Sequence, residues 1–573
     1  MKESHNIGRI RSLSFTAMAF AILGVSVTAQ AQTTTTPALE PATGAASTPA
    51  AAASADPAAK PAGHEPAATP LDGSAANPAP EPPKASGAAD GNAVATGAVS
   101  LAPVPSLAND MVAIPVSDEE SSWFYRPSLT ATFGKGEKAL SLTLYGFLEA
   151  DAMYDTTRSY NDAIGDSLVA PSYTYAGKHG RTQFSARNTR IGLLFENKPF
   201  GGLKATGVLE GDFFGNQSNS PHPVTSAYES ASSTPQSEAA YFNNPAFRLR
   251  HAYVKLQNDY VDVLAGQTYD VFGFQNYFFP CSIQYLGLPN QLFSRSTQIR
   301  LSHNFGDLSG PVSVEVAASV LRPAQRDAST PDANAGLRLG VNGWKGITTP
   351  GNTGTTALPL SLGVSGTFRQ FRPNAFAPPP TQSSEKIQGW GLSVDALIPV
   401  IPAKNAYDRG NKLTLTGSFV TGTGIGDLIN ATGGATFPTL PNPTQANPAP
   451  QYVSNIDPGI LSFGIDNKPY TIDWQAFRAG LQYYLPPSGR VIIAINFTQA
   501  TSKNMKKFFP KGGSEIELMT RVADMSRYAD VNVFWDATPA VRLGLSGQYS
   551  YVEYLDGDKP HNLRGMAQAL YAF

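Results

Sequence analysis

Apolar and polar residues alternate along most of the chain, from about residue 123 to its end. In the segment LSLTLYGFLEADAMY (140–154), Leu142 and Leu148 share one face, whereas Thr143 and Glu149 share the other. Successive side chains of a strand point to opposite faces, so this period of two predicts strands with one apolar and one polar face. The same period recurs over about ten residues at a time in the segments 203–214, 389–398 and 540–554. The pattern therefore predicts an all-β protein.

The connections between the predicted strands come in two sizes. Short turns include 197–202, 257–259 and 306–310, and long polar loops include 215–245, 271–293, 426–470 and 503–528. Short turns at one end, long loops at the other and an even number of strands, here about 16, are typical of outer-membrane barrels. We therefore expect a transmembrane antiparallel β-barrel with both termini on the periplasmic, short-turn side.

Two alternatives to this architecture remain open at this point. A soluble β-sandwich or propeller would need polar outward faces, whereas nearly every predicted strand here has an apolar face with aromatics near its ends. The segment 336–344 fits the strand pattern least well, so the strand count could change by two and the register in 323–360 stays open.

The first part of the chain differs in composition from the rest. Residues 1–31 have the features of a secretory signal peptide: Arg9 and Arg11, then an apolar run, then an Ala-Gln-Ala cleavage site. The alternative, a membrane anchor, would need a longer apolar run. Residues 32–122 are dominated by small residues and proline, so we expect a disordered periplasmic extension. Residues 123–573 form the predicted barrel domain.

Composition narrows the class of protein. The 42 Lys and Arg residues nearly balance the 44 Asp and Glu residues, which gives no support to nucleic-acid binding. The mean hydropathy of −0.18 fits a soluble protein and a β-barrel equally well. The single cysteine, Cys281, has apolar neighbours, so we interpret it as a small semi-buried residue; the alternative is a reactive or intermolecular thiol.

The polar faces of the predicted strands carry more arginines than acids. A lipid-facing arginine at mid-bilayer would cost about 2–4 kcal/mol, so we place these arginines in the lumen. The predicted pore-lining, anion-binding residues are Arg190, Arg248, Arg250, Arg300, Arg369, Arg478, Arg542 and Arg564. The inward acids, expected as an opposite acidic wall, are Glu149, Asp151, Glu210 and Asp212, with Asp395 elsewhere. Arg187 has the parity of the outward residue Ile191, which predicts a bulge or a position at the rim.

Guanidinium groups along a water-filled channel attract anions, because each presents several donors to a carboxylate or phosphate. Pores that select anions are lined by arginine or lysine, so the arginine excess favours an anion-preferring pore. The alternative, open for each single arginine, is that it pairs with one of the acids and stiffens the wall.

The loop 271–293 is unusually apolar for a connection at the cell surface. We expect it to fold into the barrel and narrow it. Its constriction residues, an apolar wall opposite the arginines, are expected to be Tyr277, Phe278, Phe279 and Tyr285. The alternative is a loop that contacts a neighbouring subunit.

Five runs of sequence resemble, in order, the strands of the DcaP-like outer-membrane porins: LYGFLEADAMYD, SARNTRIGLLFENKPFGGLKATGVLEGDFFG, FRLRHAYVKL, LAGQTYDVFG and RSTQIRLSHNF. The resemblance covers about residues 140–306. It implies a trimeric 16-stranded channel for small negatively charged solutes, with Arg190, Arg248, Arg250 and Arg300 at lumen positions. It also implies that the loop after the fifth strand forms the constriction. The coiled-coil segment that the family has at its N-terminus is replaced here by the Ala/Pro-rich stretch.

The expected function is passive diffusion of small, preferentially anionic solutes of the carboxylate type through the outer membrane. No cofactor or metal is expected, and the partners are membrane lipid, the solute and two further copies of the chain. The sequence lacks G-x-S-x-G, H-E-x-x-H and P-loop motifs, so we do not expect an enzyme. The alternative function is a structural or adhesive barrel tethered to the cell wall. A plugged lumen would suit a barrel of about 8–10 strands better than one of 16.

The last segment, NLRGMAQALYAF, is expected to be the strand that closes the barrel. It would pair with the strand near residue 145, so that no sheet edge is left in lipid. Its aromatic end, Phe573, resembles the signal by which outer-membrane barrels are recognised for assembly. Its outward residues are small before Tyr571, so we expect this strand to contact a neighbouring subunit or the interfacial girdle.

Overall fold

The computed structural model describes residues 129–573, except 167, 216–241, 275–279, 284–286, 307–309, 326–327, 351–353, 376–380, 383–385, 406, 433–455, 457–458, 464–467 and 509–521. The predicted signal peptide and the whole of the predicted extension therefore lie outside the described residues. No helix among the described residues is long and apolar enough to cross a membrane.

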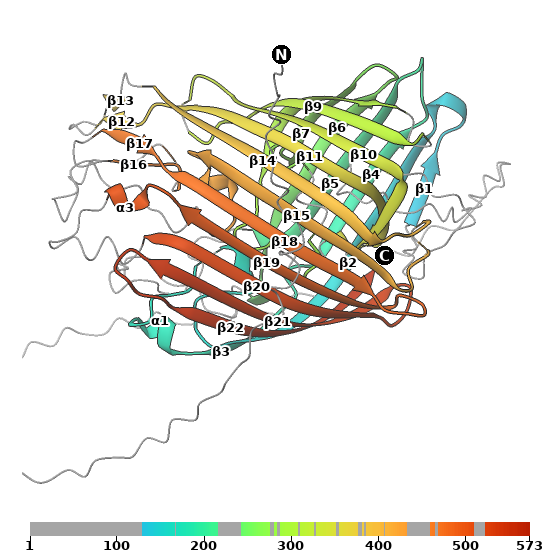
Figure 1. The fold of residues 1–573 in the computed structure, drawn as a ribbon. Helices are drawn as coiled ribbons and strands as arrows, with labels where there is room; N and C mark the ends of the chain where they lie inside the picture. The colour runs from blue at the N-terminus through green and yellow to red at the C-terminus, as the bar shows by residue number, and fades with distance from the viewer. Residues whose placement is uncertain are drawn as a thin grey trace, which may run out of the picture. The chain divides into compact units, whose positions relative to one another are not determined.

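The described residues form a closed antiparallel β-barrel (Figure 1). Its wall consists of β2 (Leu140–Asp155), β3 (Arg181–Ser185), β4 (Arg190–Asn197), β5 (Lys204–Gly215), β6 (Ala246–Gln257), β7 (Asp262–Tyr269), β8 (Arg295–Phe305), β9 (Val312–Leu321), β10 (Asp332–Thr348), β11 (Thr356–Phe371), β14 (Ile387–Ile401), β15 (Lys412–Thr423), β18 (Asp473–Tyr484), β19 (Val491–Ser502), β20 (Ala523–Asp536), β21 (Val541–Tyr554) and β22 (His561–Ala572). Because β3 and β4 are two pieces of one broken strand, the wall has 16 strands, and the predicted fold class is confirmed.

The remaining short elements lie outside this ladder or at its ends. The long connections include the helices α1 (Tyr175–Lys178) and α3 (Met505–Phe508), and the strand pairs β12 (Asn374–Ala375) with β13 (Thr381–Gln382) and β16 (Leu461–Phe463) with β17 (Pro469–Thr471). The long connections gather at one end of the barrel and the short turns at the other (Figure 1). This asymmetry is the one expected from the sequence.

The barrel closes where β2 meets β22. Their register runs from Phe147 opposite Ala572 to Asp155 opposite Arg564, which confirms the predicted closing pair. Beyond this register, Gly146 and Phe573 exchange two backbone hydrogen bonds. The short strand β1 (Leu129–Phe133) then continues the line of β22 along the first half of β2. A closed ladder leaves no unpaired backbone at the seam, which a membrane-spanning wall requires.

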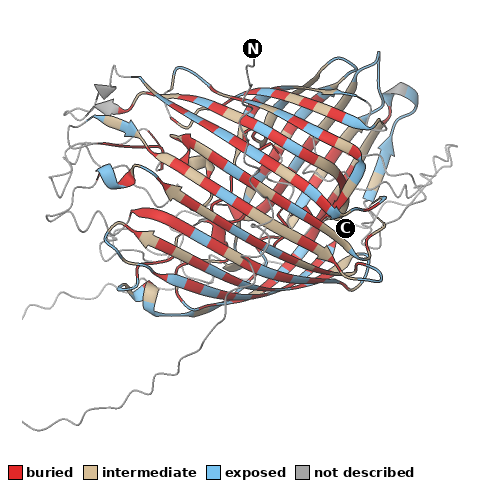
Figure 2. Cartoon of the chain, in the orientation of Figure 1, coloured by how far each residue is buried: buried red, intermediate tan, exposed pale blue. Residues whose placement is uncertain are grey.

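Burial alternates along most of the length of the wall strands (Figure 2). In β22, for example, Leu563 and Tyr571 are exposed on the outer face, whereas Arg564 and Gln568 are buried on the inner face. The outer face of the wall is predominantly apolar, as a lipid-facing surface must be, and its exposed aromatic residues include Tyr154, Phe184, Phe247, Trp390 and Trp535. The parity inferred from the sequence therefore holds.

The wall is interrupted between β3 and β4. Four residues, 186–189, lie outside both strands, and the inward parity changes from odd in β3 to even in β4. Arg187 lies in this break, is 3% exposed and forms an ion pair of 2.8 Å with Asp162. A register break is one of the two explanations that the parity of Arg187 left open.

Candidate channel constriction

The connection from β7 to β8 runs inside the barrel. Its described residues reach the inner face of the distant strands β19 and β20. Asn496 Nδ2 donates to the carbonyl of Cys281 over 2.7 Å, and Thr498 Oγ1 donates to the carbonyl of Pro289 over 2.7 Å. Ser282 Oγ donates to Asp530 over 2.7 Å. The loop is therefore attached to the wall opposite its own strands.

Apolar contacts accompany these hydrogen bonds. Cys281 and Ile283 are fully buried in a cluster with Tyr484, Phe534 and Met566 of the far wall. Burying such side chains is worth roughly 1.5–3 kcal/mol each, so the loop position is supported by packing as well as by hydrogen bonds. The buried cysteine fits its interpretation as a small packed residue. The predicted constriction residues Tyr277, Phe278, Phe279 and Tyr285 lie outside the described residues.

The connection that follows β15 contacts the loop between β7 and β8. The backbone N–H of Phe293 donates to the carbonyl of Leu428 over 3.0 Å, and that of Asn290 donates to the carbonyl of Asn430 over 2.9 Å. Both acceptors belong to the connection that follows β15. The two loops together cover the inner face of the later strands.

The arginines predicted on the early strands lie together on the opposite side. Arg190 is on β4 and Arg248 and Arg250 are on β6, with the acids Glu210 and Asp212 between them on β5. Arg248 binds Asp212 through two nitrogens, at 2.9 and 2.7 Å. Arg250 contacts both acids, at 2.8 and 3.1 Å, and Arg190 lies 3.5 Å from Glu210. These two acids therefore lie among the arginines and do not form an opposite wall.

Two more arginines extend this cluster onto β8. Arg300 donates to the side chain of Gln298 over 3.2 Å and also to the carbonyl of Tyr269. Arg295 lies over the rings of Tyr269 and Phe293, 5.7 and 5.5 Å from their centroids. We call the five arginines of β4, β6 and β8, with Glu210 and Asp212, the basic wall. Its five guanidiniums outnumber its two carboxylates.

Another carboxyl group, Asp270, lies just beyond β7 beside this wall. Burial raises the pKa of Asp270 above its usual value, although hydrogen bonds from Ser294 and Ser296 and the charge of Arg300 oppose the shift. When Asp270 is counted as a third carboxylate, the five arginines of the basic wall still outnumber the acids, so the wall keeps a positive excess.

Exposure distinguishes the members of the basic wall. The side chain of Arg248 is 27% exposed and that of Arg190 is 12% exposed, whereas Arg250 is nearly fully buried at 1%. Arg248 and Arg190 can therefore touch a solute, and Arg250 holds the two acids in place beneath them.

The other four predicted arginines lie behind the loops. Arg369, Arg478, Arg542 and Arg564 are each at most 2% exposed. Three of them bind carboxylates: Arg369 contacts Asp332 and Asp427 at 2.8 and 2.6 Å, Arg542 contacts Asp536 at 2.6 Å, and Arg564 contacts Asp155 at 2.8 Å. Arg478 donates to Thr416 over 3.0 Å. These side chains point inward, as predicted, but the structure places them in covered positions.

The two remaining acids of the predicted acidic wall lie on β2. Glu149 accepts a hydrogen bond of 2.8 Å from Asn188, and Asp151 is also buried. Asp395 is buried on β14 and accepts a hydrogen bond from Ser393. Within the described part of the chain, no group of three or more His, Cys, Asp or Glu residues is placed to hold a metal ion.

Arg295 is the member of the basic wall that the sequence pattern did not reveal. Its odd number gives it the parity of the outward residues Thr297 and Ile299. It nevertheless lies inside, because it stands at the strand end where the ladder joins the loop. Alternation predicts the face of a residue only within a regular ladder, so it does not predict the face of a residue where a strand joins a loop.

A closed barrel of 16 strands, with a polar interior and a loop fastened across it, defines an outer-membrane channel of the porin class. The sequence pattern of the family described as Gram-negative porin matches residues 95–504, so the chain belongs to this family. The family and the fold indicate a channel rather than an enzyme and place the protein in the outer membrane.

Solved structures are similar in fold. The outer membrane channel DcaP of Acinetobacter baumannii is 17% identical, with a TM-score of 0.51, and the match covers 77% of this chain and 100% of that chain. This confirms the resemblance to the DcaP-like porins at the level of the fold. The anion-selective porin from Comamonas acidovorans is 11% identical, with a TM-score of 0.39, over 76% of this chain and 100% of that chain. No curated protein matches the chain.

Proposed function

We propose that this porin conducts small anionic solutes, carboxylates in particular, by passive diffusion. The observation that carries the proposal is the composition of the basic wall. Three of its five arginines pair with its two carboxylates, whereas Arg300 contacts Gln298 and Arg295 lies over the Tyr269 ring. A guanidinium whose charge is not balanced by a neighbouring carboxylate of the protein can donate two hydrogen bonds to the carboxylate of a solute.

The position of the basic wall supports the same function. The wall belongs to β4, β6 and β8, whereas the described residues of the constriction loop are fastened to β19 and β20. A solute that passes between them meets positive charge on one side and the largely apolar loop on the other. Such a pairing suits an organic acid, which has a charged end and an apolar body.

Conductance of the purified protein in a planar bilayer tests the proposal. Under a gradient of potassium chloride, the sign of the reversal potential reports which ion crosses more easily. We expect the sign for chloride, and we expect added small carboxylates to reduce the chloride current by competition. A cation-selective reversal potential, or no conductance at all, would show the proposal to be wrong.

For the assembly we propose a homotrimer whose contact surface includes the barrel seam. The outward residues there are small: Ala150 pairs with Ala569, and Ala152 pairs with Ala567. Small side chains let two surfaces approach closely within a membrane. The mass of the detergent-solubilised complex measures this, and a monomer that conducts would contradict it.

We propose the same processing that the sequence predicts. Residues 1–31 are removed as a signal peptide, and residues 32–122 extend into the periplasm. The N-terminal sequence of the protein purified from outer membranes tests the first point, and protection of the extension from protease added to intact cells tests the second.

A further inference from the structure

Glu149 and Asp151 form a buried carboxyl pair on the inner face of β2. The two residues are two positions apart on the strand, so their side chains point to the same face, and they are 4% and 7% exposed. A hydrogen bond joins the two side chains. An ionised carboxylate can only accept hydrogen bonds, so one member of this carboxyl pair must carry the proton that it donates.

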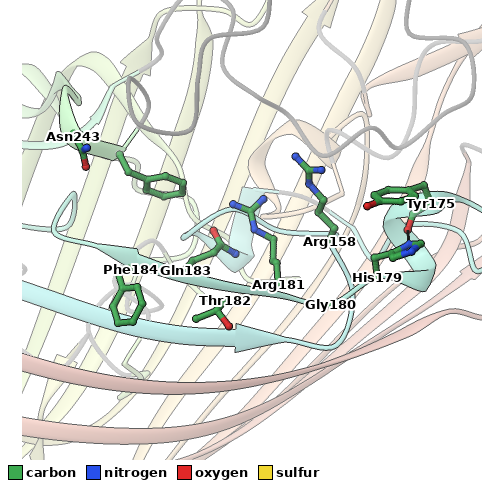
Figure 3. A pocket seen from close by; sticks show the side chains of 10 residues that line it. Arg158, Tyr175, His179, Gly180, Arg181, Thr182, Gln183, Phe184 and Asn243 are labelled. Atoms are coloured by element: carbon green, nitrogen blue, oxygen red, sulfur yellow. Dashed lines mark hydrogen bonds between the residues drawn. The ribbon is translucent and has the colours of Figure 1, made fainter.

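The neutral neighbours of the carboxyl pair donate to one of its members. Asn188 donates to Glu149 Oε1 over 2.8 Å, and Gln568 also donates to Glu149. Glu149 Oε2 and Asp151 Oδ1 accept no hydrogen bond from a donor of the described residues. The cavity beside β3 contains neither carboxyl in its described lining, which ends on this strand at Phe184 (Figure 3). The described donors therefore do not compensate two negative charges at this position.

The charged groups that face the carboxyl pair belong to three elements. Arg190 of β4 faces Glu149, whereas Arg564 of β22 and Asp162 of the connection after β2 face Asp151. Each of these groups makes an ion pair with a residue outside the carboxyl pair: Arg564 with Asp155 at 2.8 Å, Asp162 with Arg187 at 2.8 Å and Arg190 with Glu210 at 3.5 Å.

Neither member of the carboxyl pair forms an ion pair with a residue that the structure describes. Two carboxyl groups in contact in a buried position do not both ionise, because like charges repel strongly there, and they share one proton instead. The geometry and the surroundings of the carboxyl pair therefore agree on a single negative charge.

The carboxyl pair lies beside the basic wall. Arg190, a member of that wall, is 12% exposed, and its guanidinium lies over the ring of Phe147, 5.0 Å from the centroid. Phe147 precedes Glu149 by two residues on the same inner face of β2. A change of charge on the carboxyl pair therefore acts on a guanidinium that solutes in the lumen can reach.

We propose that the carboxyl pair holds one proton and makes the ion selectivity of the pore depend on pH. With the proton, the carboxyl pair carries one negative charge, and without it the carboxyl pair carries two. Loss of the proton as the pH rises adds a negative charge beside Arg190 and shifts the selectivity away from anions. This shift does not require that the pore prefers anions at any pH, so it is separate from the proposed function.

Reversal potentials of the full-length protein in a planar bilayer test the proposal, under a gradient of potassium chloride and between about pH 6 and about pH 9. Exposed carboxylates, lysines and arginines keep their charge in this window. We expect the chloride-to-potassium permeability ratio to fall about two- to threefold as the pH rises, because a unit charge several ångströms away in water changes the energy of an ion by about the thermal energy.

Three variants locate the effect. Glu149→Gln replaces the shared proton with an amide donor, so its permeability ratio should stay constant over the same pH window. Asp151→Asn is the reciprocal variant and should also give a constant ratio. Asp395→Asn removes a buried inward acid of β14 and is the matched control, which should keep the fall of the parent protein. A constant ratio in the parent protein, or an unchanged fall in both Glu149→Gln and Asp151→Asn, would overturn the proposal.

Infrared spectroscopy of the protein in detergent provides a readout that does not depend on conduction. At neutral pH, the spectrum of the parent protein minus that of Glu149→Gln should contain the C=O band of a protonated carboxyl group. A difference with carboxylate bands alone would show that both groups are ionised, and a change of the difference on addition of calcium or EDTA would identify a metal cation in place of the proton. Either result contradicts the proposal. If the protein does not conduct, the proposed function is wrong, and this spectrum still tests the carboxyl pair.

Discussion

The two sides of the barrel interior carry the same residue type in different surroundings. On the basic wall, Arg190, Arg248 and Arg250 share Glu210 and Asp212, and Arg248 and Arg190 are partly exposed. On the side of β11, β21 and β22, which the internal loops cover, Arg369, Arg542 and Arg564 each bind a carboxylate outside the basic wall, and all three are buried. The number of inward arginines therefore does not set the charge of a pore. Their acid partners and their covering loops do.

Removal of an arginine from the covered side should destabilise the protein. Arg564 and Asp155 are both fully buried, so Arg564→Ala would leave an uncompensated buried carboxylate. We expect the free energy of unfolding in urea to fall by about 3–5 kcal/mol. Arg248→Ala, on the basic wall, should lower the free energy of unfolding by a smaller amount, about 1–3 kcal/mol, because Arg250 still holds Asp212. Equal losses in the two variants would remove the distinction between the two sides.

The attachment of the loop to the covered side can be weakened separately. Asn496 donates to the Cys281 carbonyl and to Asp530, at 2.7 Å each, so Asn496→Ala should lower the free energy of unfolding by about 1–3 kcal/mol. Single-channel recordings should also show larger current fluctuations. Asn304→Ala on β8 is the control, since Asn304 Oδ1 accepts no hydrogen bond from the described residues. Steady currents from Asn496→Ala would mean that packing alone holds the loop.

Substitution of an arginine of the basic wall should change the ion selectivity of the channel. Arg248→Glu replaces a partly exposed guanidinium of the wall with a carboxylate, and we expect the chloride-to-potassium permeability ratio to fall several-fold, equivalent to about 1 kcal/mol. Arg542→Gln should leave the ratio unchanged, because that side chain is covered and bound to Asp536. A larger change in Arg542→Gln than in Arg248→Glu would reverse the assignment of the two sides.

The smallest expected effect concerns Cys281. The chain has one cysteine, and it is fully buried against the far wall. A maleimide reagent should therefore label the folded protein slowly and the urea-unfolded protein fast. Fast labelling in the folded state would mean that the loop leaves the wall on the time scale of the reaction.

The sequence predicted the wall better than it predicted the interior. Alternation identified the strands, the closing pair of β2 and β22 and the inward direction of all eight predicted arginines, because lipid outside and polar groups inside impose a period of two. The position of Glu210 and Asp212 depends on register between strands. Asp212 is opposite Arg190 on one side and Arg248 on the other, and only the pairing of β4, β5 and β6 reveals it.

The covering of the later arginines could not be predicted in this way. Parity states which face a side chain occupies, but it contains no information about a loop that arrives from β7, some 200 residues earlier in the chain than the wall that it touches. Contacts such as Ser282 with Asp530 are long-range and depend on the shape of the whole barrel.

The fastening of the constriction loop has a consequence for transport kinetics. Hydrogen bonds from Asn496, Thr498 and Gln568 reach main-chain carbonyls of the loop, so they hold its path whatever side chains it carries. A loop held in this way needs no trigger to keep its path. With the proposed function, uptake through the channel would begin without a lag and would follow the direction of the concentration difference across the membrane.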